Sequence, residues 1–462
     1  MKVNVAGYNI DKSLIDRLES KLATPEVISA AYARISRSSK SVSELRKEAL
    51  LEIDKARKSN QNIIFEMGHS SIAEHAVFNL DIIDVSRLLT DSIESIRLAS
   101  FTEKSQRYVT LSNDYVLPTE LQNSPLAEPY RNLVQELFEE YRLCFEALKA
   151  HYSKNLPQLS KRDLEGKAKE DARYILPLAT KTQMGLTINA RSLENLLRRL
   201  DSSPLAEAKE LHTELCSKLS SISPSLLRYT SSESFSCQPL DSSILTQNLE
   251  ENIKELSLLE HSPDPDDRIL AAMLYPQTPL PFEACLKRVK ALPQNEKERL
   301  WQQVWCGMKA WNKVSRAFEQ ADLSFECSMS ESCWAQFKRH RLSSMIKSIN
   351  CSSVPLIIPP AILELGRAEI WHELWLKCRK LSAELDSLKP GLGSYLRLNL
   401  DRVKVLTRMN FRELYHFVRL RSDEHAQWEI QQLSRRLASQ TKPIAPLALQ
   451  ELCGKSEFVQ KH

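Results

Sequence analysis

Basic side chains crowd into one short stretch of the chain, "AQFKRHRLSSMI" at residues 335–346, in which Arg339, His340 and Arg341 follow one another. On a helix, Gln336 would share a face with Arg339 and His340, because side chains three and four residues apart are neighbours. Such a face could clamp a pyrophosphate or contact nucleic acid. A solvated helix face is the commoner role of a charge run, and this stretch alone does not decide between these roles.

A second polar stretch, "SFTEKSQRYV" at residues 100–109, carries an acceptor, a hydroxyl and a guanidinium at alternate positions. In an extended segment, Glu103, Ser105 and Arg107 would point to one side, since strand side chains alternate. Arginine can bind a phosphate through two parallel N–H bonds, and serine adds a further donor. The stretch therefore fits a phosphate site, with a polar edge strand or loop as the simpler interpretation.

Histidines and cysteines give little support for a metal centre. The segment "MGHSSIAEHAVF" contains His69, Glu74 and His75, but its spacing matches neither of the zinc-protease patterns H-E-x-x-H and H-x-x-E-H. The ten cysteines are scattered, without a C-x-x-C pair. We therefore predict no metal site.

The segment "RMNFRELYHFVRLRSDEHAQWEI" predicts a capped helix with polar residues on its inner face. Asn410 followed by Glu413 resembles an N-cap with its capping box. Arg421, His425 and Trp428 would then lie on one helical face. The tryptophan is most simply a core residue, whereas an arginine and a histidine near the core need partners, because burying a charge is costly.

The bulk composition excludes several classes of protein. Of 462 residues, 42% are hydrophobic and 26% charged, with a net charge of +4, which is ordinary for a globular protein and argues against a dedicated nucleic-acid binder. Glycine occurs only 9 times and forms no phosphate-binding fingerprint, so phosphates would be held by side chains. The start of the chain carries no secretory pattern and no apolar run is long enough for a membrane span, which together predict a cytoplasmic protein.

Helical spacing of apolar residues recurs along the chain, and alternating segments are rarer. We expect helices at 127–153, 205–221 and 297–320, and strands at 2–8 and 76–85. The sequence therefore predicts a helix-rich α+β fold.

Two pairs of segments suggest an internal repeat on either side of a polar stretch at 231–243. "TINARSLENLLRRL" (187–200) and "TRMNFRELYHFVRLR" (407–421) share Asn-x-Arg-x-Leu, and "SIRLASFTEKS" (95–105) matches "RHRLSSMIKSI" (339–349) in register. Chance similarity between helical segments is the alternative to duplication. We expect a first module at 1–235, a linker at 236–250 and a second module at 251–462.

Together these motifs resemble those of the flavin-dependent thymidylate synthases. That family has Gly-His-x-Ser/Thr-x-x-Glu-His, a strand, Arg-His-Arg-x-x-Ser-x-Asn-x-x-Ser-x-Arg, Ala-Arg-x-x-Leu-Pro, Asn-x-Arg-Ser-Leu and a helix reading into His-Ala-Gln-Trp-Glu-Ile. In this chain the motifs are divided between the two halves. The first half keeps "GHSSIAEH", "ASFTEKSQRY", "ARYILPL" and "NARSLENLL", and the second keeps "RHR" and "EHAQWEI".

Each half has lost what the other retains. In the first half, Ser95-Ile96-Arg97 replaces Arg-His-Arg, Thr102 replaces Asn, and Leu200 and Pro204 replace the helix Arg and His. In the second half, Lys347, Ile349 and Cys351 replace Glu-x-Ser-x-Arg, Gly307-Met308 approximates Gly-His, and Gly393-Ser394 stands for Ala-Arg. Family members are homotetramers with active sites between subunits. The resemblance thus implies an intramolecular pseudo-dimer with one composite site per chain, and a homodimer that forms a pseudo-tetramer.

The resemblance also implies the reaction and the residues that perform it. The reaction would be reductive methylation of dUMP to dTMP, with methylenetetrahydrofolate as carbon donor and NADPH as reductant acting through FAD. Catalytic roles would fall to Arg421, facing the uracil, and to His69, by the flavin ring. FAD would be held by Arg339, His340 and Arg341 at its phosphates, and elsewhere by Ser71, Glu103, Asn189, Arg191, Asn195, Asn410, Arg412, His416 and His425. dUMP would be held by Glu103, Lys104, Ser105, Gln106, Arg107 and Arg173 from the first half, and by Gln336, Arg339 and Arg421 from the second.

Two other functions compatible with the substitutions are a non-catalytic descendant that binds a nucleotide or a protein partner, and a flavin-dependent methylase of another pyrimidine, in RNA.

Overall fold

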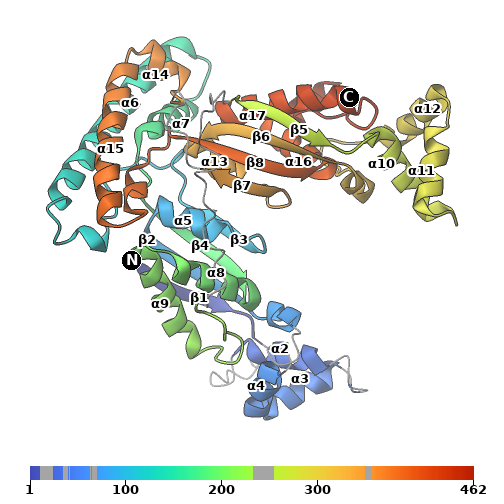
Figure 1. The fold of residues 1–462 in the computed structure, drawn as a ribbon, viewed down its shortest axis with the longest axis horizontal. Coiled ribbons are helices and arrows are strands. Elements are labelled where there is room, and N and C mark those ends of the chain that lie inside the picture. The colour runs from blue at the N-terminus through green and yellow to red at the C-terminus, as the bar shows by residue number, and fades with distance from the viewer. Residues whose placement is uncertain are drawn as a thin grey trace. The chain divides into compact units, whose positions relative to one another are not determined.

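A computed structural model describes residues 1–10, 24–34, 40, 42–62, 64, 70–232, 254–348 and 356–461. The chain forms two compact units: unit 1 is Met1–Gln247 with Ile358–Asn399, and unit 2 is Asn248–Ile357 with Leu400–His462. Figure 1 labels the elements of both units. The expected linker at 236–250 lies outside the described residues, and the module boundaries drawn from the sequence stay a prediction.

Unit 1 is built on a four-stranded antiparallel sheet of order β1-β2-β4-β3. Its strands are β1 (Lys2–Tyr8), β2 (Val77–Ser86), β3 (Ala99–Glu103) and β4 (Lys181–Asn189). Its α-helices are α2 (Glu26–Arg34), α3 (Val42–Leu51), α4 (Ile53–Gln61), α5 (Arg87–Glu94), α6 (Ala127–Asn155), α7 (Lys161–Ala172), α8 (Ala190–Ser202), α9 (Ala206–Ser220), α14 (Pro360–Glu364) and α15 (Ala368–Leu388). Short 3₁₀ turns lie at η4 (Ser70–His75), η5 (Thr119–Leu121), η6 (Arg173–Ile175) and η10 (Leu392–Leu396).

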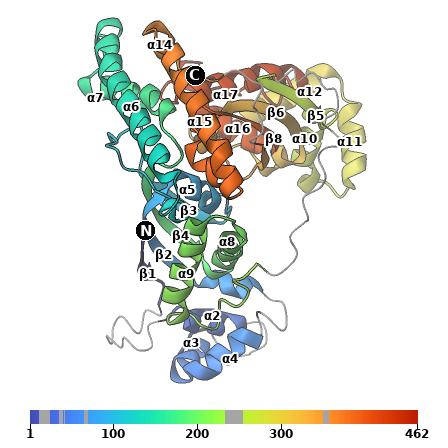
Figure 2. The same cartoon turned by 60° about the vertical axis from the view of Figure 1, so that its left-hand side comes forward.

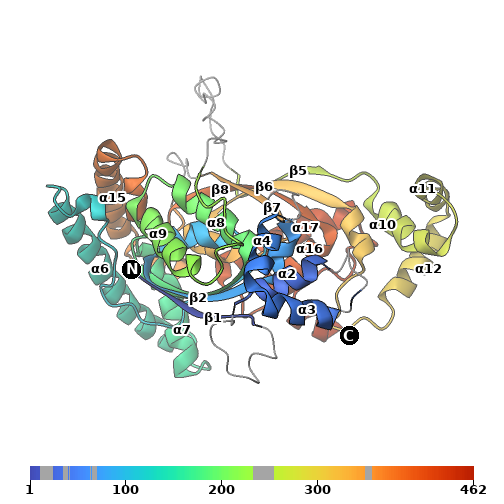
Figure 3. The same cartoon turned by 90° about the horizontal axis from the view of Figure 1, so that it is seen from below.

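Unit 2 repeats the sheet as β5-β6-β8-β7, again antiparallel throughout. Its strands are β5 (Leu256–His261), β6 (Asp322–Ser330), β7 (Ser344–Ser348) and β8 (Arg402–Asn410). Its α-helices are α10 (Pro265–Leu274), α11 (Phe282–Lys290), α12 (Gln294–Trp305), α13 (Glu331–Phe337), α16 (Phe411–Arg421), α17 (Trp428–Thr441) and α18 (Lys455–Lys461), with 3₁₀ turns η8 (Tyr275–Gln277), η9 (Arg316–Gln320) and η11 (Lys442–Ile444). Figure 2 shows α16 and α17 against this sheet, and in Figure 3 α10, α11 and α12 form a group at one end of it.

The two sheets have the same strand order, and β3 pairs with β4 in the same register as β7 with β8, which confirms the expected two-module α+β architecture. Ser100 pairs with Thr187 in unit 1, and Ser344 pairs with Arg408 in unit 2. These are the positions that the matched segments of the sequence repeat align. The core of each sheet comes from alternate apolar residues, as the period of two predicts.

A buried carboxylate fixes the same helix start in both units. Ser86 caps α5 while its N–H and hydroxyl donate to Glu207, at 2.7 and 2.6 Å. Ser330 caps α13 and donates to Glu429 in the same way. An N-cap is worth about 1 kcal/mol, and a buried carboxylate has to be hydrogen-bonded. This arrangement therefore belongs to the fold rather than to a site found in one half.

Part of the second sequence half is built into unit 1. Helix α15 lies beside α6 (Figures 1 and 2), and the Glu140 carboxylate of α6 accepts from Trp371 Nε1 at 2.9 Å and Arg367 Nε at 2.8 Å. Glu140 is 5% exposed and Trp371 is fully buried. The ion pair is therefore shielded from solvent on the carboxylate side.

Equivalent main-chain segments of the two halves pair reciprocally in unit 1. Leu178 N–H donates to the Arg397 carbonyl at 2.7 Å, and Asn399 N–H donates to the Leu176 carbonyl at 2.9 Å. Pro177 and Leu398 face each other as an isolated antiparallel bridge. Counting from Asn189 and Asn410, which end β4 and β8, makes Pro177 and Leu398 equivalent residues. The contact therefore has the self-complementary form of a two-fold interface.

Several expected elements are confirmed, and one is shorter than expected. The helices at 127–153 and 205–221 and both expected strands are present as α6, α9, β2 and β1. The helix expected over 297–320 is wrong beyond Trp305, where Gly307 at φ 72° takes a left-handed conformation that stops α12. No helix among the described residues is long and apolar enough to cross a membrane.

The expected geometry of three polar stretches is also wrong. β3 stops at Glu103, and the Arg107 N–H donates to Ser105 Oγ in a turn, so Ser105 and Arg107 do not continue an alternating strand. α13 stops at Phe337, so Gln336 shares no helical face with the arginine and histidine that follow. α16 ends at Arg421 and α17 begins at Trp428, which places His425 in the connection between two helices.

The buried hydrogen bonds of Glu140 predict that its loss destabilises the protein more than the loss of an exposed ion pair between the same helices. Glu140→Ala leaves the Trp371 indole and the Arg367 guanidinium without their acceptor, and we expect it to cost about 3 kcal/mol in urea unfolding. The control is Glu136→Ala, which removes an exposed pair with Lys377 between the same two helices and should cost no more than about 1 kcal/mol. Equal losses would show that burial of the network contributes nothing.

Candidate functional site

Unit 1 gathers charged side chains around the turn that follows β3. Arg87, the first residue of α5, donates to Glu103 Oε1 at 2.9 Å, and Thr90 Oγ1 lies 3.4 Å from the same oxygen. The Glu103 side chain is 4% exposed and that of Arg87 10%. Glu103 is therefore held by its own unit, and Arg87 is a member of the site that sequence reasoning missed.

A second ion pair lies on the other side of that turn. Arg107 Nε is 2.7 Å from Glu170 Oε2, and Arg173 Nε donates to the Glu170 main-chain carbonyl at 3.3 Å. Burial lowers the pKa of Arg173, and the positive charges of Arg107 and Arg87 lower it further. Arg173 Nη2 is buried without a hydrogen-bond acceptor. A buried guanidinium with an unused donor is costly unless a hydrogen-bond acceptor satisfies it, and the oxygens of a bound anion are one such acceptor.

An amide from the second sequence half closes this cluster. Asn399 Nδ2 donates to Gln106 Oε1 at 3.1 Å and to the Arg173 carbonyl at 2.9 Å. Gln106 Nε2 and Asn399 Oδ1 are buried and lack partners. Together with Arg173 Nη2, these atoms leave two donors and one acceptor of the cluster without a hydrogen-bond partner. Asn399 carries no motif, so only the tertiary pairing of its segment reveals it.

The unit 1 cluster suits a small anion. Arg87, Arg107 and Arg173 supply three positive charges against the two negative charges of Glu103 and Glu170, so one positive charge remains. The turn brings together Ser105, Gln106 and Arg107 from the stretch that the sequence singled out, with Arg173 from η6. A phosphate would find charged and neutral donors here, as phosphate sites built from side chains require.

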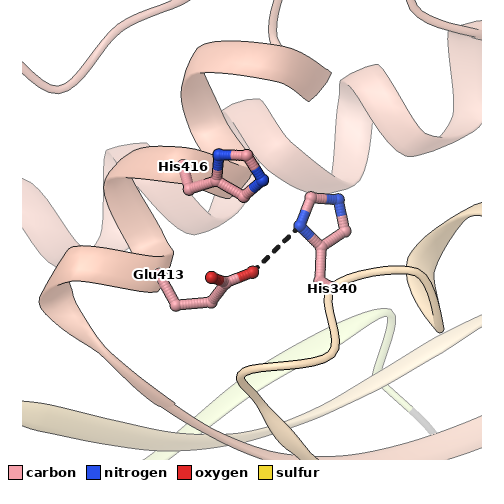
Figure 4. Close-up of side chains that lie close together, drawn as sticks. All are labelled: His340, Glu413 and His416. Atoms are coloured by element: carbon pink, nitrogen blue, oxygen red, sulfur yellow. Dashed lines mark hydrogen bonds and ion pairs between the residues drawn. The ribbon is translucent and has the colours of Figure 1, made fainter. Parts of the chain in front are cut away.

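In unit 2 a histidine lies between a carboxylate and an arginine. His340 Nδ1 is 3.1 Å from Glu413 Oε1 (Figure 4), and Arg421 Nε donates to His340 Nε2 at 3.1 Å. Arg421 Nη2 donates to the Gln336 carbonyl at 3.3 Å. His340 and Glu413 are each 3% exposed. Asn410 caps α16 as predicted. The Glu413 carboxylate, which was expected in a capping box, instead contacts His340 Nδ1.

The same residues form the one group among the described residues whose atoms are spaced as metal ligands. His340, Glu413 and His416 offer one ligand atom each within 4.8 Å (Figure 4). However, the Arg421 N–H occupies His340 Nε2, so the proton of a neutral ring sits on Nδ1, the nitrogen that would have to bind the ion. The guanidinium charge also opposes a cation. The donor set therefore does not suit a metal ion.

The two Asn-x-Arg sets have matching structural roles. Asn189 caps α8 and Asn410 caps α16. Arg191 pairs with Glu74, and Arg412 pairs with Glu319 at 2.9 Å. Asn195, expected at the cofactor, accepts from Arg198, whereas His416 at the equivalent place in α16 is exposed. Both arginines therefore join their helix to the 3₁₀ turn that precedes the second strand of the sheet, η4 before β2 and η9 before β6.

This correspondence corrects one expected alignment. Glu74 in η4 and Glu319 in η9 hold equivalent arginines, so Ser70 corresponds to Ser315. In sequence, the second-half counterpart of Gly-His is therefore Lys313-Val314, the pair just before Ser315, and not Gly307-Met308.

The remaining predicted residues are spread over both units. Ser71, Arg339, Arg341 and His425 are exposed, and the backbone N–H of Lys104 donates to the Gln183 carbonyl. His69 lies outside the described residues. Exposed arginines on either side of a buried histidine fit an anionic group such as the pyrophosphate of a dinucleotide.

A known family matches this chain twice. The model of the family described as "Thymidylate synthase complementing protein" covers residues 17–225 and again 257–447, most of the chain. The chain belongs to this family. The repeat of the family over both halves agrees with the shared sheet order and register, and confirms the resemblance noted in the sequence.

Relatives fall into two groups by how much of the chain they cover. A flavin-dependent thymidylate synthase of Clostridium tetani is 30% identical over 210 residues, 45% of this chain and 82% of the relative. One from Geobacter sulfurreducens is 30% identical over 205 residues, 44% of this chain and 81% of the relative. The UPF0159 protein Ta1429 of Thermoplasma acidophilum is 23% identical over 443 residues, 86% of this chain and 88% of the relative. The chain therefore aligns with the UPF0159 protein over most of its length, and with the two thymidylate synthases over less than half of it.

The His340 environment predicts a pH dependence of stability. Burial lowers the pKa of His340 below its ordinary value near 6.5, and the Arg421 charge acts in the same direction. The folded state thus resists a proton that the unfolded chain accepts, so stability is lost as pH falls from about 6.5 toward the lowered pKa. His340→Gln should remove this part of the loss in urea unfolding between pH 7.5 and 5. The exposed His425→Gln variant should keep it, and identical pH profiles for the wild type and His340→Gln would contradict the assignment.

Proposed function

We propose that the protein is an FAD-dependent thymidylate synthase that converts dUMP to dTMP, with methylenetetrahydrofolate as carbon donor and NADPH as reductant. The observation that carries the proposal is the anion site of unit 1, where the buried Arg173 has an unused donor among the residues of Glu-x-Ser-x-Arg. Family membership and the names of the relatives support the reaction class.

The proposed substrate contacts follow from the chemistry of each cluster. Arg107, Arg173 and Ser105 would bind the dUMP phosphate, and the unused Nε2 of Gln106 would donate to the nucleotide. From the second half, Gln336, Arg339 and Arg421 would complete the set. Arg421 would stabilise negative charge on the uracil as it develops, since a fixed cation acts most strongly where charge forms.

The flavin, when bound, supplies the redox chemistry, and this chain supplies binding, orientation and exclusion of water. Arg339 and Arg341 would hold the FAD phosphates. Their exposure beside the buried His340 supports that role, because a large anionic group needs reachable cations. Either Asn-x-Arg set could contact FAD, since the asparagine cap and the arginine–glutamate pair occur in both.

One composite site per chain follows from the complementary residue loss. The first half retains Glu103, Ser105 and Arg107, and the second retains Gln336 and Arg339. Random decay would not leave one complementary set. We propose further that two chains associate as a homodimer that rebuilds the four-module assembly, and that the protein acts in the cytoplasm.

A dUMP titration distinguishes Arg107, in the part of the motif that the first half retains, from Arg97, in the part that it has lost. Arg107→Ala removes a charged phosphate partner and leaves Glu170 unpaired near the anion, so we expect binding to weaken about 10- to 100-fold. Arg97→Ala changes the exposed counterpart of Arg341 in the first half and should alter dUMP affinity less than about threefold. Equal effects from the two substitutions would overturn the one-site proposal.

Flavin stoichiometry tests the same proposal independently. The purified protein, reconstituted with excess FAD and freed of unbound flavin, should hold one FAD per chain by absorbance. Two per chain would mean that both halves bind flavin and that the residue losses are not complementary.

A non-catalytic descendant is the second candidate. It is favoured by the ion pair of Lys347 with Glu331, which occupies the second half's counterpart of the Glu-x-Ser-x-Arg glutamate. Protein that binds dUMP but forms no dTMP with FAD, NADPH and methylenetetrahydrofolate would support this candidate over the enzyme.

A further inference from the structure

We infer that Glu413 and His340 are positioning residues for Arg421, acting as a relay that sets the direction of its guanidinium. The inference rests on the proposed function, in which Arg421 faces the uracil. The relay runs Glu413–His340–Arg421 through two contacts of 3.1 Å and ends where Arg421 Nη2 donates to the Gln336 carbonyl at 3.3 Å.

Hydrogen-bond chemistry allows only one proton arrangement in the relay. An arginine Nε–H can only donate, so His340 Nε2 must be the acceptor. The ring proton is then on Nδ1 and is donated to the Glu413 carboxylate. Burial lowers the pKa of His340, in agreement with a neutral ring. Glu413 thus selects the tautomer that can accept from Arg421, in the way that a carboxylate bonded to one ring nitrogen fixes the other nitrogen of catalytic and metal-binding histidines.

The surroundings hold the imidazole in place. The Phe417 ring stands edge-on to His340 with centroids 4.9 Å apart, and the Phe337 ring lies 6.4 Å away. The titratable and charged groups that face His340 are Glu413 and His416 from α16, and Arg421 at the end of that helix. A ring fixed by packing and by both nitrogens gives Arg421 a rigid acceptor on its Nε side.

Comparison of the two halves shows which contacts are common to both and which occur in the second half alone. The first-half positions equivalent to His340, Glu413 and Arg421 are Ile96, Ser192 and Leu200, all buried. The half that lacks the proposed catalytic arginine thus also lacks both residues that position it. The helix caps and the ion pairs of the Asn-x-Arg sets occur in both halves. A network needed only for folding would be expected in both.

A double-mutant cycle on dTMP formation tests the relay. Glu413→Gln removes the charge that fixes the tautomer, and we expect kcat to fall about 10- to 100-fold, as is typical when a residue that orients a functional side chain is lost. The KM for dUMP and the FAD content should change less than about threefold. In an Arg421→Ala background, Glu413→Gln should cause no further loss, because residues that act as a unit are not additive. Additive losses would show that Glu413 acts elsewhere and would overturn the relay.

A matched control removes a different partly buried carboxylate from the same unit. Asp266 accepts the N–H groups of Leu447 and Ala448 and lies outside the relay, so Asp266→Asn should lower stability and leave kcat unchanged. If Glu413→Gln does not fold, Glu413→Asp, which keeps the charge and shortens its reach, takes its place in the cycle.

Nitrogen-15 NMR of labelled histidine measures the tautomer of His340 and does not depend on enzyme activity. The His340 signal, assigned by its loss in His340→Gln, should report a neutral ring protonated on Nδ1 at pH 7. The opposite tautomer would overturn the relay, as would stoichiometric Zn²⁺ binding that shifts both His340 and His416. If the wild-type protein forms no dTMP, the proposed function is overturned and so is the role of the relay. If the wild type is active and Glu413→Gln has an unchanged kcat, only the relay is overturned.

Discussion

Reciprocal main-chain pairing between residues 176–178 and 397–399 is the constraint on which unit 1 depends. The paired segments are buried, with Leu176 and Leu398 fully inaccessible, so their N–H and carbonyl groups have no alternative partner in water. Glu207 strengthens the same contact by accepting from the Tyr395 hydroxyl at 2.8 Å. A segment of the second sequence half is thus a structural part of the first unit, and Asn399 reaches Gln106 and Arg173 as a consequence.

The two halves share a scaffold but place different charged side chains on it. Each has the strand order, the serine cap held by a buried glutamate, and the Asn-x-Arg helix start. The anion cluster around Arg173 has no counterpart of the same composition in the second half, where Ser394 stands at that position, and the relay on Arg421 has none in the first. Because the scaffold contacts are duplicated, loss of a functional residue from one half leaves the structure of that half intact.

Much of the fold was predictable because its signals are local. Apolar periodicity gave α6, α9 and β2, and the side-chain chemistry of Asn410 gave the start of α16. The ends of elements were predicted less well, since Gly307 stops α12 and a turn replaces the strand after Glu103. For the candidate site, the motifs singled out Gln106, Arg107 and Arg173, which the structure brings together in unit 1. They did not single out Arg87, Glu170 and Asn399. Their roles arise from contacts between segments, and no spacing along the chain encodes such contacts.

The charge reversal beside the helix caps explains how the altered half stays folded. Arg87 pairs with Glu103 in unit 1, and the equivalent positions in unit 2 hold Glu331 and Lys347, 2.8 Å apart. A lysine opposite an unchanged arginine would bury two like charges, which is far more costly than a paired ion. Exchange of both members keeps the pair while it removes a carboxylate from the motif. The second half has therefore kept a buried ion pair at this place with its charges exchanged, which is not what unconstrained decay would be expected to leave.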